Sequence, residues 1–539
     1  MHGSETTNIL MGFKKLFDSS KQDKIMLVFP PGKVYVYPDG TPASRKTCSP
    51  PIGIAYLAAN LLKHGYKVSC LDMSVENYER EVLSGSFVYY GLNTEELLER
   101  VREKDPDIIG FSILFSMLAS DVLQMCAAVK EAFPDKHILL GGQHPTGAPY
   151  EVMKTPSVDF VLLGEADESI IQLMDALNGL QQLESVHSLV FRRQDGSICN
   201  TQDGVKAEHE GDGWKYYSRR NSGVPKKIND LTFPAWHLFN MEGYFSMSVR
   251  NGGGDAIADR YAVMITSRGC PHVCSFCTSP LSGGYRAYRT REIESVLEEI
   301  RWLVDMYGVG EIQFVEDNFF VNKKRTKKLM RALAEEFPEI VFWNTGGVEV
   351  NAMDKEMIGL MAKANFHRAI LAIEAGDEEV QDSSVDKKVK LDRLPEVVGH
   401  LRKNNIDIKA LYMIGFPGET RAQIDKTVEL AKSLGVLDFH LSIVTPLPGT
   451  PLWDQCVKED LFLDGRTIND INFGQAGIKL PDTSPEELEF IRRSVWQEAF
   501  EKRRSMNEQA VTLKKFGVAK KAMQAHKTHE EYQGFTTRK

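Results

Sequence analysis

Short hydrophobic runs alternate with helix-length amphipathic segments over the first third of the chain, beginning at Lys24. Short β-rich runs bounded by turn residues predict strands, and longer segments with apolar residues at helical spacing predict helices. Strands are predicted at 25–29, 67–72, 107–113, 137–140 and 160–163, and helices at 52–64, 94–104, 119–133 and after Asp167. This alternation predicts an α/β fold with a doubly wound, Rossmann-like parallel sheet, whose ligands bind beyond the carboxyl ends of the strands.

A second alternation begins at Tyr261 and keeps nearly constant spacing. Strands are predicted at 261–266, 311–315, 341–343, 368–373, 407–414 and 438–444, and a helix-length segment follows each strand before the last. The segments 293–307 and 394–403 carry apolar residues at helical spacing. Such units predict a partial (βα)6 TIM-like barrel, whose chemistry belongs at the carboxyl ends of its strands.

The rest of the chain divides around these two domains. We expect a polar N-terminal segment (1–23), the doubly wound domain (24–180), a connector (181–255), the barrel (256–451) and a helical C-terminal region (452–539). In the connector, 189–200 has Asp195-Gly196 at its centre and predicts a β-hairpin. Its many aromatic residues predict that the connector packs along both domains.

Composition narrows the class of protein. A chain of 539 residues predicts two or three domains, and 42% hydrophobic and 26% charged residues are ordinary for a soluble globular protein. The net charge of -9 argues against binding of nucleic acid through a global positive field. We expect neither a secretion signal nor a membrane helix, because no apolar run is long enough. Eight cysteines without a disulfide pattern predict a reducing cytoplasm.

One loop carries most of the chemical information. Cys270, Cys274 and Cys277 follow the first predicted barrel strand, close enough to bind one metal centre. A structural zinc site normally takes four ligands in two pairs, and the other five cysteines are scattered singly. Three thiolates without a fourth suit a 4Fe-4S cluster that leaves one iron open for a small molecule. The spacing alone leaves both kinds of site open.

The loop resembles the signature of radical SAM enzymes. The cysteines stand in a C-x3-C-x2-C pattern, with Arg-Gly before the first and Phe276 before the last. The resemblance implies that S-adenosylmethionine (SAM) chelates the open iron through its amino and carboxylate groups. It also implies that an electron from an external donor, such as a flavodoxin or ferredoxin, cleaves SAM to methionine and a 5′-deoxyadenosyl radical.

Residues at the ends of the barrel strands are the SAM contacts that this resemblance implies. The expected contacts are Phe276, Glu316, Asp317, Asn318, Glu374, Gly415, Pro417 and Gly418. Glu316 or Glu374 can also serve as a carboxylate that stabilises a helix N-terminus. Their position at predicted carboxyl ends favours the functional role.

The first domain resembles the cobalamin-binding domain that precedes the radical SAM core in one large class of methyltransferases. The resemblance rests on the P-P-G after the first strand, the helix at 51–65, the G-G-Q-H after the fourth strand and the later L-G-E. The expected cobalamin contacts are Pro31, Ser112, Ser116, Gly141, Gly142, His144, Gly164 and Glu165, although each taken singly also fits an ordinary turn. The D-x-H-x-x-G box whose His ligates cobalt in other cobalamin proteins is absent. We therefore expect cobalamin to bind without a protein imidazole on cobalt.

Together the two domains resemble the cobalamin-dependent radical SAM methyltransferases of class B. This implies methyl transfer from SAM, through methylcobalamin, to an unactivated carbon of a small-molecule substrate. Cofactors must supply this chemistry because a carbon without an acidic proton cannot be activated by pKa tuning. Several stretches, including 89–92, look closest to methyltransferases of fosfomycin-type phosphonate biosynthesis. An anionic substrate of that kind would favour Arg286, Arg289 and Arg291 as cation candidates, whereas the simpler interpretation is solvated helix-entry arginines.

Three other functions share parts of this sequence pattern. The same architecture can carry out oxidative cyclisation or rearrangement without methyl transfer, and no residue decides this. A methylthiotransferase is disfavoured because the chain has no second three-cysteine cluster and no basic tail. A non-catalytic cobalamin sensor would have no reason to keep three cysteines at cluster spacing.

Overall fold

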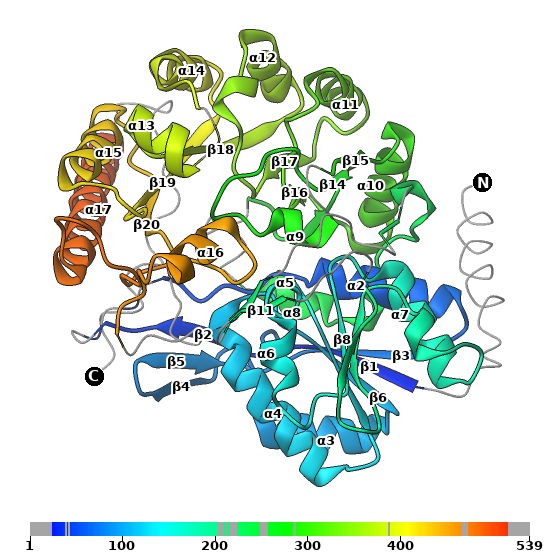
Figure 1. Cartoon of the computed structure of the whole chain (residues 1–539). Coiled ribbons are helices and arrows are strands. Elements are labelled where there is room, and N and C mark those ends of the chain that lie inside the picture. The colour runs from blue at the N-terminus through cyan, green and yellow to red at the C-terminus, as the bar shows by residue number, and fades with distance from the viewer. Residues whose placement is uncertain are drawn as a thin grey trace, which may run out of the picture.

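The protein is represented by a computed structural model that describes residues 24–515, except 38–39, 41, 43, 203–207, 211–212, 216–223, 226, 248–256, 284–286, 386, 388 and 465–472. Two α/β halves lie one above the other in Figure 1, a barrel half at the top and a sheet half below. The predicted N-terminal segment 1–23 and the chain after Lys515 lie outside the described residues.

The sheet half contains a seven-stranded sheet with the order β10-β9-β8-β7-β6-β1-β3. The strands β1 (Lys24–Phe29), β3 (Lys67–Asp72), β6 (Ile108–Ser112), β7 (His137–Gly141) and β8 (Phe160–Leu162) are parallel. The main helices are α2 (Ile52–Lys63), α3 (Thr94–Lys104), α4 (Ala119–Ala132) and α7 (Asp167–Leu177). The central strands are almost wholly buried, as expected for a parallel sheet with both faces covered. The predicted doubly wound domain is therefore confirmed.

Two parts of this half differ from the prediction. The expected hairpin forms as β9 (Leu189–Arg192) and β10 (Ile198–Asn200), but β9 pairs with β8 and so extends the main sheet as its antiparallel edge. It therefore belongs to the sheet and not to a connector. A small antiparallel sheet of β2 (Gly32–Tyr35), β5 (Phe87–Tyr90) and β4 (Glu81–Ser84) was not predicted. There the Tyr90 ring occupies the space of a side chain at Gly32.

The barrel half is a parallel sheet with the order β13-β16-β17-β18-β19-β20. Its strands are β13 (Tyr261–Met264), β16 (Glu311–Phe314), β17 (Val341–Asn344), β18 (Phe366–Glu374), β19 (Asp407–Ile414) and β20 (Phe439–Ile443). The helices between them include α10 (Ile293–Tyr307), α11 (Lys323–Glu336), α12 (Lys355–Lys363), α14 (Leu394–Lys403) and α15 (Arg421–Ser433). Because β13 and β20 are the two ends of this order, the barrel is partial, as predicted.

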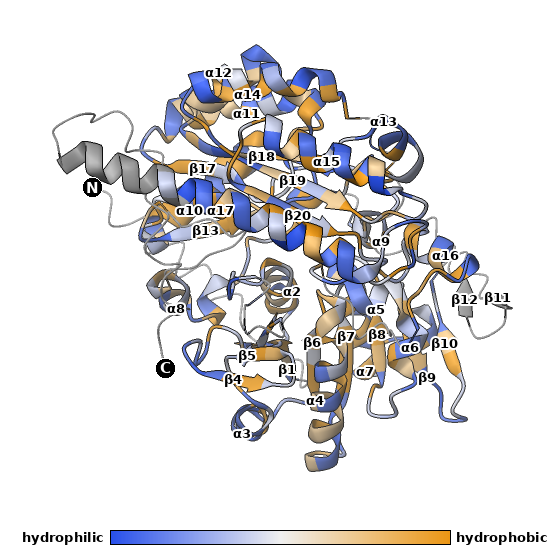
Figure 2. Ribbon diagram, turned by 90° about the vertical axis from the view of Figure 1, so that its left-hand side faces the viewer, coloured by the Kyte–Doolittle hydropathy of each residue, from blue (hydrophilic) through white to orange (hydrophobic). Residues whose placement is uncertain are grey.

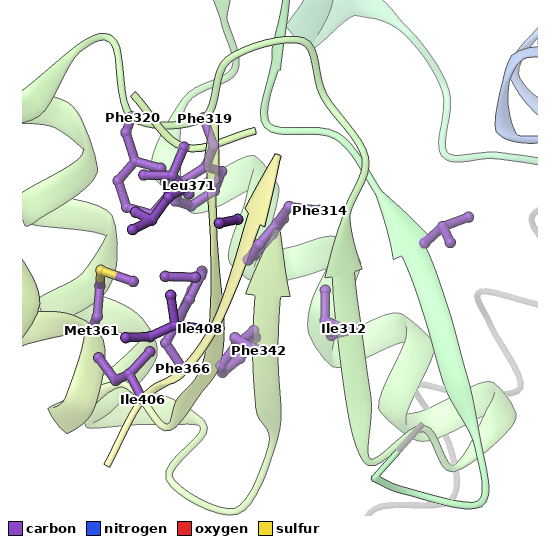
Figure 3. Close-up of a cluster of buried hydrophobic side chains, with 14 of the residues drawn as sticks. Ile312, Phe314, Phe319, Phe320, Phe342, Met361, Phe366, Leu371, Ile406 and Ile408 are labelled. Atoms are coloured by element: carbon purple, nitrogen blue, oxygen red, sulfur yellow. The ribbon is translucent and has the colours of Figure 1, made fainter. Parts of the chain in front are cut away.

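Hydrophobic side chains fill the space between the barrel strands and their helices. Figure 2 shows hydrophobic residues along strands such as β7 and β17, whereas the helices carry hydrophilic residues as well. In Figure 3, Phe314 lies between Phe342 on one side and Phe319 and Phe320, which follow the end of β16, on the other. The Phe314 and Phe319 ring centroids are 4.7 Å apart. This stack fixes the chain immediately after Asn318 and so supports the loops above the sheet.

Segments after the sheet half and after the barrel join the two halves. Trp236 and Tyr244, which lies in α8 (Met241–Ser246), are fully buried in a hydrophobic cluster shared with residues of both halves. This confirms that the connector packs on both domains. Two of its aromatic residues, Tyr216 and Tyr217, lie outside the described residues. After the barrel come α16 (Pro451–Lys458) and α17 (Pro485–Lys515). Arg492 of α17 donates to the Leu441 carbonyl of β20 at 3.0 Å and to the Tyr37 hydroxyl of the sheet half.

Candidate active site

The three-cysteine loop is held at both ends. It leaves β14 (Ser267–Arg268) and returns as β15 (Arg289–Thr290), and these two short strands pair antiparallel. Gly269 has φ +82°, and a Cβ there would lie 2.3 Å from the Ala287 carbonyl oxygen. Only glycine fits such a left-handed, closely packed position without strain. The backbone therefore presents Cys270 from a fixed turn.

The three thiols lie in an environment that suits a cluster. Cys270, Cys274 and Cys277 are free, and burial raises the pKa of each thiol; the nearby Cys277 thiol raises the pKa of Cys270 and of Cys274 further. Asn318 Nδ2 lies 3.7 Å from Cys270 Sγ, and the Ser279 N–H donates to Cys277 Sγ at 3.5 Å. Within the described residues, no three His, Cys, Asp or Glu side chains gather around a single ion position. A 4Fe-4S cluster places its thiolates on different irons and so needs them farther apart.

The predicted Glu316-Asp317-Asn318 segment lies against the cysteine loop. Asp317 Oδ2 accepts a hydrogen bond from the Gly269 N–H at 3.0 Å. The buried Glu316 carboxylate accepts bonds from the Thr266 N–H at 3.2 Å and from the Ser267 hydroxyl. Burial raises the pKa of Glu316 to about 7. All three residues thus support the loop, and their contact with SAM stays a prediction.

Glu374 ends β18 in a strained conformation. Its φ is +68°, which is uncommon for a non-glycine residue, and the register with β19 shifts at this point. Its Oε1 lies 2.7 Å from Lys387 Nζ, and both side chains are nearly buried. Burial lowers the pKa of Lys387, but the Glu374 carboxylate more than offsets this, so the pKa is raised. Lys387 is not predictable from the sequence, because a lysine in a polar segment resembles a solvated one.

The turn after β19 contains or contacts several other residues that were predicted to bind SAM. The rings of Phe276 and Phe416 are 6.1 Å apart, edge to face. Gly415 has φ +87°, and a Cβ there would lie 2.8 Å from a methyl of Leu488 in α17. Pro417 and Gly418 line a cavity of about 490 Å³, which is within the range of small-molecule sites. Pro417 and Gly418 therefore border open space, whereas Gly415 is packed against α17.

The predicted cobalamin contacts gather at the carboxyl ends of neighbouring strands in the sheet half. Ser112 of β6 pairs with Gly141 of β7, and Ser116 Oγ lies 3.0 Å from His144 Nδ1. His144 is buried, and burial lowers its pKa to about 4, so the ring is neutral near pH 7. Gly142 has φ +103°, and a Cβ there would lie 2.7 Å from the Ile113 carbonyl oxygen.

The other residues at this edge of the sheet half are either apolar or lie at the contact with the barrel half. Leu114 and Phe115, at the end of β6, are 42% and 49% exposed. An exposed apolar pair beside glycine turns fits the face of a flat macrocycle. Pro31 follows the end of β1 and is buried. Gly164 donates its N–H to Thr146 Oγ1 at 2.9 Å, and the Glu165 carboxylate meets Arg268 of the barrel half.

Two of the arginines that were candidates for binding an anionic substrate already form ion pairs within the protein. Arg289 pairs with Glu165, and Arg291 pairs with the buried Glu299. Arg286 lies outside the described residues. Neither Arg289 nor Arg291 is therefore available to an anionic substrate without breaking an ion pair.

Comparisons with known proteins agree with this division into two halves. Residues 264–431 match the radical SAM superfamily, and residues 40–173 match the B12 binding domain. The chain is 26% identical to cytidylyl-2-hydroxyethylphosphonate methyltransferase of Streptomyces wedmorensis, over 86% of this chain and 87% of that protein. It is 25% identical to anaerobic magnesium-protoporphyrin IX monomethyl ester cyclase of Cereibacter sphaeroides, over 75% of this chain and 60% of that protein.

Solved structures share the fold. One is TsrM from Kitasatospora setae, a radical SAM methyltransferase solved with cobalamin and a 4Fe-4S cluster, with a TM-score of 0.61, 17% identity, and coverage of 81% of this chain and 75% of that chain. Another is the cobalamin-dependent SAM radical enzyme OxsB, with a TM-score of 0.62, 13% identity, and coverage of 86% and 65%. The order of a sheet half followed by a barrel half is thus a known arrangement.

Proposed function

We propose that this chain, which is a cobalamin-dependent radical SAM enzyme, transfers a methyl group from SAM, by way of cobalamin, to an unactivated carbon of a small molecule. One observation of the structure carries the proposal. The edge of the sheet half that holds the predicted cobalamin contacts touches the cysteine loop, because Gln143 Nε2 donates to Ser282 Oγ at 2.5 Å. The two cofactor regions therefore lie next to each other, as a reaction on one carbon requires.

The residues divide between the two cofactors. Cys270, Cys274 and Cys277 would hold three irons of the 4Fe-4S cluster, and Asn318 would donate to the Cys270 sulfur. When bound, the cluster supplies the electron that cleaves SAM, and cobalamin carries the methyl group. Lys387 and Glu374 form a buried ion pair beside the loop, where they would bind the polar end of SAM. Ser112, Gly141, Gly142 and the exposed Leu114 and Phe115 would form the cobalamin surface.

The finer identity of substrate and partners extends this proposal. The phosphonate methyltransferase relative makes a small phosphonate substrate one candidate. The external electron donor is expected to be a flavodoxin or ferredoxin, because the cluster must be reduced from outside. No described helix is both long and apolar enough to cross a membrane. We place the reaction in the cytoplasm, where the cluster thiols stay reduced.

Cyclisation without methyl transfer is the second candidate. It is favoured by the similarity to the monomethyl ester cyclase over 75% of this chain. The two functions differ in what becomes of SAM. Methyl transfer leaves S-adenosylhomocysteine as well as 5′-deoxyadenosine, whereas cyclisation needs only the radical cleavage.

An anaerobic assay distinguishes them. The protein is reconstituted with iron, sulfide and cobalamin, then given a reductant and SAM with a deuterated methyl group. We expect both S-adenosylhomocysteine and 5′-deoxyadenosine, measured by mass spectrometry, and no 5′-deoxyadenosine from a variant with all three cysteines replaced by Ala. Formation of 5′-deoxyadenosine alone by the cobalamin-loaded protein would overturn methyl transfer and favour the cyclase.

A further inference from the structure

A buried group of charged residues crosses the boundary between the two halves. Arg268 Nη1 lies 3.0 Å from Glu165 Oε2 and 2.6 Å from Asp167 Oδ2. Arg289 Nη1 lies 3.1 Å from the same Glu165 oxygen. The four side chains are only 4 to 16% exposed. We call Glu165, Asp167, Arg268 and Arg289 the interdomain ion cluster.

The interdomain ion cluster joins the two segments that carry the cofactor regions. Arg268 stands two residues before Cys270, and Glu165 directly follows Gly164 at the end of β8. The backbone joins the same segments, because the Glu165 N–H donates to the Ser282 carbonyl at 3.0 Å, five residues after Cys277. The two halves also approach each other closely at Gly147, where a Cβ would lie 2.2 Å from the Pro448 carbonyl oxygen.

The charge of Arg268 is well compensated within this cluster. Burial lowers the pKa of Arg268, but the carboxylates of Asp167 and Glu165 more than offset this, so the pKa is raised and the guanidinium stays charged. The guanidinium also lies over the Tyr56 ring of α2, 5.1 Å from its centroid. A buried ion pair adds little net stability, because desolvation offsets the attraction, but its fixed geometry specifies an orientation. The orientation that it fixes here is that of the cysteine loop on the sheet half.

We propose that Arg268 and Glu165 are positioning residues that set the separation and orientation of the iron-sulfur cluster relative to cobalamin. This inference rests on the proposed function in one respect, namely that both cofactors act on one substrate carbon. A misplacement of about 1 Å in such a site can cost on the order of 100-fold in rate. The gain in rate from a rigid contact across the boundary therefore outweighs the desolvation of four charged side chains.

The test compares Glu165→Gln, Arg268→Lys and the double variant with wild type. The control is Arg301→Lys with Glu336→Gln, because this ion pair is exposed and lies within the barrel half. In reconstituted protein without substrate, pulsed EPR measures the distance between cob(II)alamin and the reduced cluster. We expect one narrow distribution in wild type and control, and a shifted or broadened one in each single variant. The double variant should change no more than the worse single variant, because both act on one contact.

A second readout uses the fate of SAM. The ratio of S-adenosylhomocysteine to 5′-deoxyadenosine should fall about 10-fold or more in the variants and stay unchanged in the control. Distances identical to wild type in both single variants would overturn the proposal. So would loss of cobalamin in Glu165→Gln alone, which would make Glu165 a cofactor contact, or loss of iron in Arg268→Lys alone. If wild type forms no S-adenosylhomocysteine, the proposed methyl transfer fails, while the EPR distances still decide the positioning role.

Discussion

Glu419 has a buried carboxyl group whose charged form is poorly stabilised. Its Oε2 accepts the N–H groups of Gly415 and Phe416 at 2.6 and 2.9 Å, whereas Oε1 has no hydrogen-bond partner among the described residues. Burial outweighs these bonds and raises the pKa from 4.5 to about 7. A pKa raised in the folded state stabilises the protein at low pH, and this stability is lost as the pH rises through about 7.

Glu419→Gln should therefore flatten the dependence of stability on pH. Between pH 5 and 8 the wild type should lose up to about 3 kcal/mol through this group, since each pKa unit corresponds to about 1.4 kcal/mol. Asp72 and Glu316 also have raised pKa values, so the variant keeps part of the slope. Thermal denaturation across this pH range measures the difference, with Glu339→Gln, an exposed carboxylate, as the control. Parallel curves for wild type and Glu419→Gln would contradict the prediction.

For single residues, the sequence correctly indicated those whose place follows from local spacing along the chain. The cysteines lie on one short loop, and Asp317 and Asn318 meet that loop because β13 and β16 are neighbours in a parallel sheet. The roles of Lys387 and Arg268 were missed, since they depend on partners that are close in space but distant in sequence. No local pattern distinguishes a buried arginine from a solvated one.

At the scale of elements, α17 supports the turn after β19. Leu488 is 1% exposed and lies where a side chain on Gly415 would be, so the helix backs the turn directly. Leu488→Ala should reduce the free energy of unfolding by about 2 to 5 kcal/mol, because it leaves a cavity in a packed core. It should also weaken SAM binding, because the turn loses its support.

Phe490→Ala is the matched control, since Phe490 lies on the same helix but is 62% exposed. Thermal denaturation and equilibrium binding of SAM to the reconstituted protein measure the two effects. Equal stabilities for the two variants would show that α17 does not support the turn.

The elements themselves were largely predictable. The bounds of α3, α10, α14, β3 and β19 agree with the sequence, because long periodic segments carry a strong signal. The small sheet of β2, β4 and β5 was missed because its strands are short, and β4 is exposed throughout, so it lacks a buried face. The pairing of β9 with β8 was also missed, since a hairpin pattern does not specify its third partner.

At the scale of the whole molecule, the sequence separated two domains, but their contact is continuous. One hydrophobic cluster contains Val34 and Ala55 of the sheet half, Trp236 of the connector and Val263 of the barrel half. The Ala235 N–H donates to the Ala55 carbonyl at 3.0 Å, which ties the connector to α2. Contacts of this kind come from distant segments, so periodicity along the chain cannot predict them. A shared core predicts that the two halves unfold together.

Trp236→Ala should separate this unfolding into two steps. Trp236 is fully buried in the shared cluster, and its truncation should cost about 3 to 5 kcal/mol, mostly at the boundary between the halves. Calorimetry of the cofactor-free protein should show one transition in wild type and two in the variant. Trp496→Ala, whose side chain is 37% exposed on α17, should keep a single transition. If Trp236→Ala still unfolds in one step with equal calorimetric and van't Hoff enthalpies, other contacts, such as the interdomain ion cluster, are sufficient to couple the halves.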